Sequence, residues 1–246
     1  MTAVAALTER LVRVALRDFD LLIGIATPVA TLLGLNAALR HIIDTGTMSY
    51  ADYVLPAIIV QAMLLGAVTT AERAAWEQSS GFTIRLRAQP VSELAPMTAR
   101  MLYCLIRGAL ALAAAVATAH LLGFRLTGGI TNTTGFVVLP LILTLALSLG
   151  ADATGTWLRR SGAGQLLLIP QLILVLASTG LAPADSFPEW IQPFVRHQPV
   201  SQITGTLRGL ATGNAAVSDL VITAAWCVGL LVALGSIAVR MQRRPR

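Results

Sequence analysis

Six long apolar stretches dominate this sequence and limit what the chain can fold into. They lie at residues 21–39, 53–71, 101–124, 133–158, 164–182 and 220–239. Roughly 20 apolar residues in an α-helix cross a bilayer core about 30 Å thick, so each stretch is long enough to span a membrane. Only 12% of the residues are charged and 55% are apolar, which leaves too few polar side chains to cover a soluble globule. We therefore expect an all-α membrane protein in which six transmembrane helices form a single domain, residues 1–246.

The arginines predict how these spans are oriented. With the N-terminus inside, thirteen of the 18 arginines lie in inner segments, four in outer segments and one within a span. Inner loops carry the excess of basic residues. The chain is thus expected in the cytoplasmic membrane, multi-pass, with both termini cytoplasmic. Its net charge of +6 then serves orientation and attraction to anionic membrane lipids rather than binding of nucleic acid.

Residues 1–20 are expected to form an amphipathic helix along the inner membrane surface. Apolar and arginine side chains recur at helical spacings on two neighbouring stripes: Val4, Leu7, Leu11 and Val14, and Arg10, Arg13 and Arg17. This pattern is typical of an interfacial helix. Such a helix serves either as a docking or gating element or as an arginine anchor that sets the topology.

Two segments outside the apolar stretches have distinctive sequences. In the inner loop, residues 72–100, a Ser-Ser-Gly break at 79–81 ends one helix, and Pro90 stops a short amphipathic segment. Its composition fits an ordinary solvated connection or a force-transmitting contact. The outer region, residues 183–219, holds four prolines, which exclude a continuous helix, and aromatic residues suited to the membrane interface. Two short helices dipping into the outer leaflet fit it, as does a loop folded on the surface.

Motifs in these two segments resemble those of a known family. Residues 85–92, Arg-Leu-Arg-Ala-Gln-Pro-Val-Ser, are similar to the segment after the second span of bacterial ABC-2 type permeases. Residues 188–201, Pro-Glu-Trp-Ile-Gln-Pro-Phe-Val-Arg-His-Gln-Pro-Val-Ser, with Leu-Arg-Gly-Leu at 207–210, look like the signature of daunorubicin/doxorubicin-resistance type permeases. Mycobacterial exporters of complex lipids share that signature. The resemblance covers nearly the whole chain.

The resemblance implies one permease half of an ATP-driven exporter. Two permease subunits, forming a homodimer or a heterodimer, would pair in the membrane and bind cytoplasmic ABC ATPase subunits. It implies a coupling helix that rests on the ATPase, with the candidate ATPase-coupling residues Glu77, Gly81, Arg85, Leu86, Arg87 and Pro90. It also implies re-entrant outer helices between spans five and six, with the candidate gate residues Trp190, Pro193, Phe194, Gln198 and Pro199.

The absence of lysine bears on the energy supply. A P-loop ATPase needs a lysine at the β- and γ-phosphates, in a Gly-rich loop ending Gly-Lys-Ser/Thr, and this chain has neither. ATP and Mg²⁺ are therefore expected on a separate partner chain, and this chain is expected to bind no cofactor and to be no enzyme. We predict no metal site either, because His41, His120 and His197 lie in different segments.

Charged and amide side chains inside the spans are further candidates. Arg107 and Asp152 each lie six residues from the cytoplasmic end of adjacent antiparallel spans, about 9 Å deep, so we expect an intramembrane ion pair. The alternative is that Arg107 reaches the headgroups and Asp152 faces a wet vestibule. Gln61 and Gln171 either face a substrate path or, as we favour, bond to neighbouring helices.

Together these patterns predict an exporter permease that moves an amphipathic drug or lipid-like molecule across the cytoplasmic membrane. One alternative is a proton-coupled secondary transporter using Asp152, although such proteins carry internal repeats that this sequence lacks. A second alternative is a membrane assembly subunit that transports nothing. The sequence determines neither the substrate nor whether the permease partner is identical.

Overall fold

Helices make up the secondary structure of the chain in the part that the computed structural model describes, residues 3–43, 48–82, 86, 88, 91–159 and 162–242. In chain order they are α1 (Ala3–Arg17), α2 (Asp20–Leu39), α3 (Tyr50–Ser79), α5 (Ala95–Leu121), α6 (Gly129–Leu158), α7 (Ala163–Leu176), the short 3-10 helix η1 (Ala184–Ser186), α8 (Gln192–His197), α9 (Pro199–Thr212) and α10 (Val217–Gln242).

Five of these helices are long and apolar enough to cross a membrane: α2, α3, α5, α6 and α10. They correspond to the first four predicted spans and the sixth. The fifth predicted span, 164–182, is only partly helical, because α7 has 14 residues and ends at Leu176, about 21 Å long at 1.5 Å per residue. Its predicted end at residue 182 is wrong, and a sixth full-length transmembrane helix is not confirmed.

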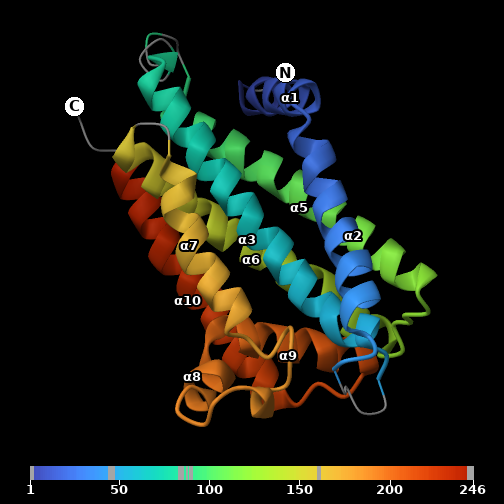
Figure 1. Ribbon diagram of the computed structural model, residues 1–246. Coiled ribbons are helices and arrows are strands. Elements are labelled where there is room, and N and C mark those ends of the chain that lie inside the picture. The colour runs from blue at the N-terminus through green and yellow to red at the C-terminus, as the bar shows by residue number, and fades with distance from the viewer. Residues whose placement is uncertain are drawn as a thin grey trace.

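The helices run up and down between two ends of the bundle (Figure 1). Both chain termini lie at one end, with α1 across it; we call this the terminal end. Helices α8 and α9 lie at the opposite end, which we call the α9 end. The chain passes along α7 from the terminal end toward the α9 end, and α10 returns, so the α7 segment completes the path despite its shortness.

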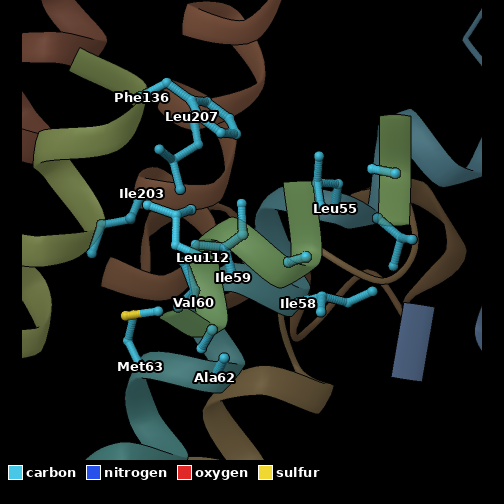
Figure 2. Packing of buried hydrophobic residues seen from close by; sticks show 14 of the residues in the cluster. Leu55, Ile58, Ile59, Val60, Ala62, Met63, Leu112, Phe136, Ile203 and Leu207 are labelled. Carbon is cyan, nitrogen blue, oxygen red and sulfur yellow. The ribbon is translucent and has the colours of Figure 1, made fainter. Parts of the chain in front are cut away.

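Helix α3 is the centre of the bundle. Of its most apolar window 78% is buried, against 22% in α2 and 11% in α10. Figure 2 shows its side chains meeting those of three other helices, α5, α6 and α9. The labelled residues are Leu55, Ile58, Ile59, Val60, Ala62 and Met63 of α3, Leu112 of α5, Phe136 of α6, and Ile203 and Leu207 of α9.

Glycines allow α6 and α7 to approach α3 closely. A Cβ on Gly155 of α6 would lie 2.2 Å from the carbonyl oxygen of Ala71, and one on Gly164 of α7 would lie 2.7 Å from that of Val68. Small residues at helix contacts are typical of membrane bundles, where close backbone packing replaces the hydrophobic effect as the source of association. The terminal half of α3 is thereby fixed against both neighbours.

Candidate functional site

A buried ion cluster joins four helices within the terminal end. Arg100 of α5 donates from Nε to Asp152 Oδ1 of α6 at 2.5 Å and from Nη1 to Glu77 of α3. Gln242 of α10 donates to the second oxygen of Asp152 at 3.2 Å. The three charged side chains are at most 6% exposed. We call these four residues the Arg100 cluster. Removing one partner from such a cluster leaves an uncompensated buried charge, so the four helices depend on one another here.

A second cluster joins α2, α3 and α5. Asp20, the first residue of α2, accepts hydrogen bonds from Arg73 at 3.2 Å and from the Tyr103 hydroxyl. The Nε of Arg107 lies 3.7 Å from the same carboxylate and has no hydrogen-bond partner among the described residues. We call these four residues the Asp20 cluster. It carries two arginines and one carboxylate.

Arg107 lies in a slot that two glycines leave open. A Cβ on Gly24 of α2 would lie 2.9 Å from Nε of Arg107, and a Cβ on Gly66 of α3 would lie 3.0 Å from Nη1. The guanidinium is therefore packed between α2 and α3.

The predicted Arg107–Asp152 pair is wrong, because each residue pairs elsewhere: Asp152 with Arg100 and Arg107 with Asp20. The predicted depths assumed that the third span starts at residue 101, but α5 starts at Ala95. Arg107 thus lies about 9 Å deeper than that count gave. Arg100, predicted to lie in the inner loop, takes the place opposite Asp152.

A third polar contact fixes the start of α7. Both oxygens of Glu72 in α3 accept backbone N–H groups, from Gly162 at 3.2 Å and from Gly164 at 2.8 Å. The first N–H groups of a helix have no partner within it, and a carboxylate there is favoured by the helix dipole. Glu72 thus ties α7 to α3 at the terminal end.

At the α9 end, the side chains of Gln198, between α8 and α9, and of Ser201 in α9 bind the open backbone groups where α7 stops. Gln198 donates from Nε2 to the carbonyl oxygens of Leu174, at 2.9 Å, and of Ala177. The Oγ of Ser201 accepts the N–H of Thr179 at 3.0 Å. These bonds satisfy backbone groups that have no helical partner once α7 has ended.

Arg208 ties α9 to α3 at the same end. Its guanidinium stacks over the ring of Tyr53, 3.8 Å from the centroid, and donates to the carbonyl oxygens of Tyr53 at 2.9 Å and Thr179 at 3.4 Å. Burial lowers the pKa of Arg208 from its ordinary value, and its contacts with Tyr53 oppose that shift. The group stays charged at neutral pH, because arginine is effectively always protonated in proteins.

Comparison with known proteins identifies the family. Residues 29–240 match the model of the ABC-2 family transporter protein. The chain belongs to the ABC-2 transporter family. The matched region runs from the middle of α2 nearly to the end of α10 and contains most of both polar clusters; Asp20 and Gln242 lie outside it. The match confirms the family that the motifs at 85–92 and 188–201 resemble.

This ABC-2 permease is similar to several drug-resistance permeases. It is 30% identical over 227 residues to the probable doxorubicin resistance ABC transporter permease DrrC of Mycobacterium tuberculosis, covering 92% of this chain and 82% of the relative. It is 33% identical over 202 residues to DrrB of that organism, covering 79% and 70%. A daunorubicin resistance permease of Streptomyces coeruleorubidus is 26% identical over 201 residues, covering 80% and 70%. Members of this family are the transmembrane subunits of ABC transporters, not the ATPase subunits.

The predicted ATPase-coupling residues of the permease fall into two groups. Arg85, Arg87 and Pro90 lie outside the described residues. Gly81, the second residue after α3, has a φ of +69°, a left-handed conformation that favours glycine. Leu86 is half-buried, and Glu77 belongs to the Arg100 cluster, with its side chain 6% exposed. The coupling role of this segment stays a prediction.

The predicted gate residues of the permease do not form one group. Pro193 and Pro199 occupy the first turns of α8 and α9, where a missing N–H is tolerated. Gln198 is buried against α7, whereas Trp190 is 81% and Phe194 50% exposed. Whether any of them gates a path stays a prediction. Arg208 was not predicted as a site residue. The signal that could have found it is that residues 183–219 contain only two arginines, Arg196 and Arg208.

The remaining candidates are less informative. Gln61 of α3 and Gln171 of α7 are both half-buried, and Oε1 of Gln171 has no hydrogen-bond partner among the described residues. Neither joins the polar clusters, so substrate contact and helix contact both stay open for them. Within the described ranges, no group of three or more His, Cys, Asp or Glu side chains could hold a metal ion.

Proposed function

We propose that this chain is the permease subunit of an ATP-driven exporter that moves an amphipathic drug or lipid-like molecule outward across the cytoplasmic membrane. The observation that carries the proposal is the family match over 29–240, together with relatives named for doxorubicin and daunorubicin resistance. The apolar helices offer a path for a molecule soluble in lipid, and the chain has no lysine for a P-loop. ATP hydrolysis therefore belongs to a separate ABC ATPase subunit.

The terminal end is assigned to the cytoplasm. This assignment rests on the arginines, which are more numerous in the segments at the terminal end than in those at the α9 end. The segment after α3, residues 81–92, then faces the ATPase, and α8 and α9 lie toward the outer leaflet as re-entrant helices. The α7 segment then forms the fifth of six crossings, and α10 forms the sixth.

Force from the ATPase has a structural route into the bundle. The coupling segment follows α3 directly, and α3 carries Glu77, which binds Arg100 and through it Asp152. A displacement of the end of α3 would therefore move α5 and α6 as well as α10. A second permease subunit, identical or different, would undergo the matching movement.

The structure gives little support to the two alternatives, a proton-coupled secondary transporter and a membrane assembly subunit. Asp152 is fully buried, and both its oxygens accept hydrogen bonds from Arg100 and Gln242. A proton-coupling carboxylate needs a path for protons, so this arrangement does not favour a secondary transporter. No observation favours an assembly subunit that transports nothing.

The proposal is tested by reconstitution with a candidate ABC ATPase. The permease and ATPase are co-expressed and placed in proteoliposomes, and ATP hydrolysis and movement of a fluorescent amphiphile are measured. We expect hydrolysis and movement with the complex, and neither with the permease alone or with an ATPase whose P-loop lysine is replaced. Export that continues with that inactive ATPase, or that an ionophore abolishes while ATP is plentiful, would overturn the proposal.

A further inference from the structure

A cavity of about 790 Å³ opens at the terminal end between α1 and the last turns of α3. Its wall combines apolar, aromatic and charged side chains, and its size lies in the range of small-molecule sites. Its charged lining residues are Arg10, Asp18, Glu72, Arg73, Glu77 and Arg159.

Three of the charged groups in this wall already have partners. Arg73 binds Asp20, and Glu77 binds Arg100. Both oxygens of Glu72 accept the N–H groups at the start of α7. Arg73 and Glu77 are thus neutralised by opposite charges, and Glu72 faces the positive end of the α7 dipole, so all three side chains are held by the protein itself.

The charged groups left over are two arginines and one carboxylate. Arg10 and Arg159 form no ion pair within the described ranges, and neither does Asp18. Arg10 is nevertheless held in place, because its guanidinium stacks over the Phe82 ring at 4.1 Å. Arg159 ends α6 in a left-handed conformation, with a φ of 53°. Among the charged groups of the wall that have no such partner, the arginines therefore outnumber the carboxylate.

The apolar part of the wall extends this cationic site toward the membrane. Leu11 is buried against α5, whereas Val14 and Trp76 are exposed. A tryptophan beside arginines is typical of the headgroup region of a bilayer. A ligand with an anionic head and an apolar chain satisfies both halves of the wall.

We propose that this cavity binds one anionic phospholipid of the adjoining leaflet, with its phosphate between Arg10 and Arg159 and the start of its acyl chains along Val14 and Trp76. This goes beyond general attraction to the membrane, because it names a site. It rests on the proposed position of the terminal end at a membrane surface, but not on transport or on ATP. Lipid held there would link α1 to the ends of α3 and α6.

Trp76 itself reports the occupant. The full chain is prepared with its other tryptophans, Trp157, Trp190 and Trp226, replaced by phenylalanine, and placed in vesicles of phosphatidylcholine and phosphatidylglycerol. Brominated acyl chains, which quench tryptophan on contact, are carried either by the anionic or by the zwitterionic lipid. Because both leaflets have the same composition, the result does not depend on orientation.

The expected result is selective quenching by the anionic lipid. One arginine near an anionic lipid raises the binding constant of that lipid about five-fold. We therefore expect phosphatidylglycerol to bind at least about five-fold more tightly than phosphatidylcholine. Arg10→Gln with Arg159→Gln should bring the ratio close to one. Arg10→Lys with Arg159→Lys should keep most of it, which guards against loss through misfolding.

A matched control removes equal charge elsewhere on α1. Arg13 and Arg17 are exposed and do not line the cavity, so Arg13→Gln with Arg17→Gln should leave the ratio unchanged. Equal falls in the two glutamine double variants would mean general surface attraction and would overturn the proposed site. So would a ratio near one in the parent chain, or a Trp76 that neither lipid quenches.

Discussion

The buried Arg100 and Arg107 and the half-buried Arg208 of this permease bind groups on other helices. Arg100 neutralises carboxylates from α3 and α6, Arg107 fills a slot between α2 and α3, and Arg208 stacks on a tyrosine of α3. Arginine suits these places, because its planar guanidinium binds two acceptors at once and stays charged when buried. Their contribution to stability can therefore be tested one residue at a time.

Replacing Arg100 should be among the most damaging changes in the chain. Arg100→Met leaves Glu77 and Asp152 buried without a counter-charge, and we expect a loss of about 3–5 kcal/mol in the free energy of unfolding. The measurement is unfolding in mixed detergent micelles. Arg13→Met, at an exposed pair with Glu9, is the control and should unfold as the parent does. Indistinguishable curves for the two variants would contradict a role for the Arg100 cluster, and Arg100→Lys should lie between them.

Arg208 should depend on its shape as well as its charge. Arg208→Lys keeps the charge but loses the planar stack on Tyr53 and one of its donor groups, so we expect a loss of about 1–2 kcal/mol in the free energy of unfolding. Arg196→Lys is the control, because Arg196 forms an exposed pair with Asp185. If both lysine variants unfold together, the stack on Tyr53 contributes nothing measurable.

Among the elements, α3 organises the others and α7 depends on them. Helix α3 meets α6 through small residues and supplies Glu72 and Glu77 to the polar contacts of the terminal end. Helix α7 is short, and its two ends are held by side chains from elsewhere, Glu72 at its start and Gln198 at its end. Removing contacts of α3 should therefore lower the stability of the whole bundle, whereas removing those of α7 should loosen that helix locally.

A methyl group on Gly155 should separate α6 from α3. Its Cβ would lie 2.2 Å from the backbone oxygen of Ala71, and a backbone cannot move aside as a side chain can. We expect Gly155→Ala to lose about 1–3 kcal/mol in the free energy of unfolding. Gly229→Ala in α10, where a Cβ meets nothing within 4 Å, should be neutral or up to about 1 kcal/mol more stable. The measurement is unfolding by detergent titration, in which Gly155→Ala should unfold before Gly229→Ala. The reverse order would contradict close packing at Gly155.

Removing the Gln198 side chain should loosen the end of α7 locally. Gln198→Ala takes the hydrogen-bond donor from the carbonyls of Leu174 and Ala177, at a cost of about 1–3 kcal/mol for buried groups left unpaired. Hydrogen exchange followed by mass spectrometry should rise in the peptides covering 174–180. Gln202→Ala, whose side chain binds the nearby Arg196 carbonyl, should not raise exchange there. Unchanged exchange in the Gln198 variant would refute the capping role.

For the whole molecule, apolar periodicity was enough to predict the helical membrane fold, but not the interior partners. Five predicted spans coincide with helices long enough to cross, because burying apolar surface in lipid depends on local composition. The end of α7 was missed, because residues 177–182 carry no charge that would mark the end of a span, and the side chains of Gln198 and Ser201 bind backbone groups there. Arg107 and Asp152 were recognised as buried charges, yet their partners depend on where α5 begins, which hydropathy fixes only to within a turn or two.

The terminal end of the molecule is predicted to face the cytoplasm, and cysteine labelling tests this orientation. Arg17 at the terminal end and Ser218 near the α9 end are both exposed, and the native Cys104 and Cys227 are buried and free. In a chain with both native cysteines replaced by alanine, a membrane-impermeant maleimide added to intact cells should label Ser218→Cys and not Arg17→Cys. Opening the cells should expose Arg17→Cys to the same reagent. The arginine excess at the terminal end is the physical reason, because translocating those guanidinium groups during insertion is unfavourable. Labelling of Arg17→Cys on intact cells would invert the bundle, move the coupling segment away from any cytoplasmic ATPase and so contradict the proposed exporter.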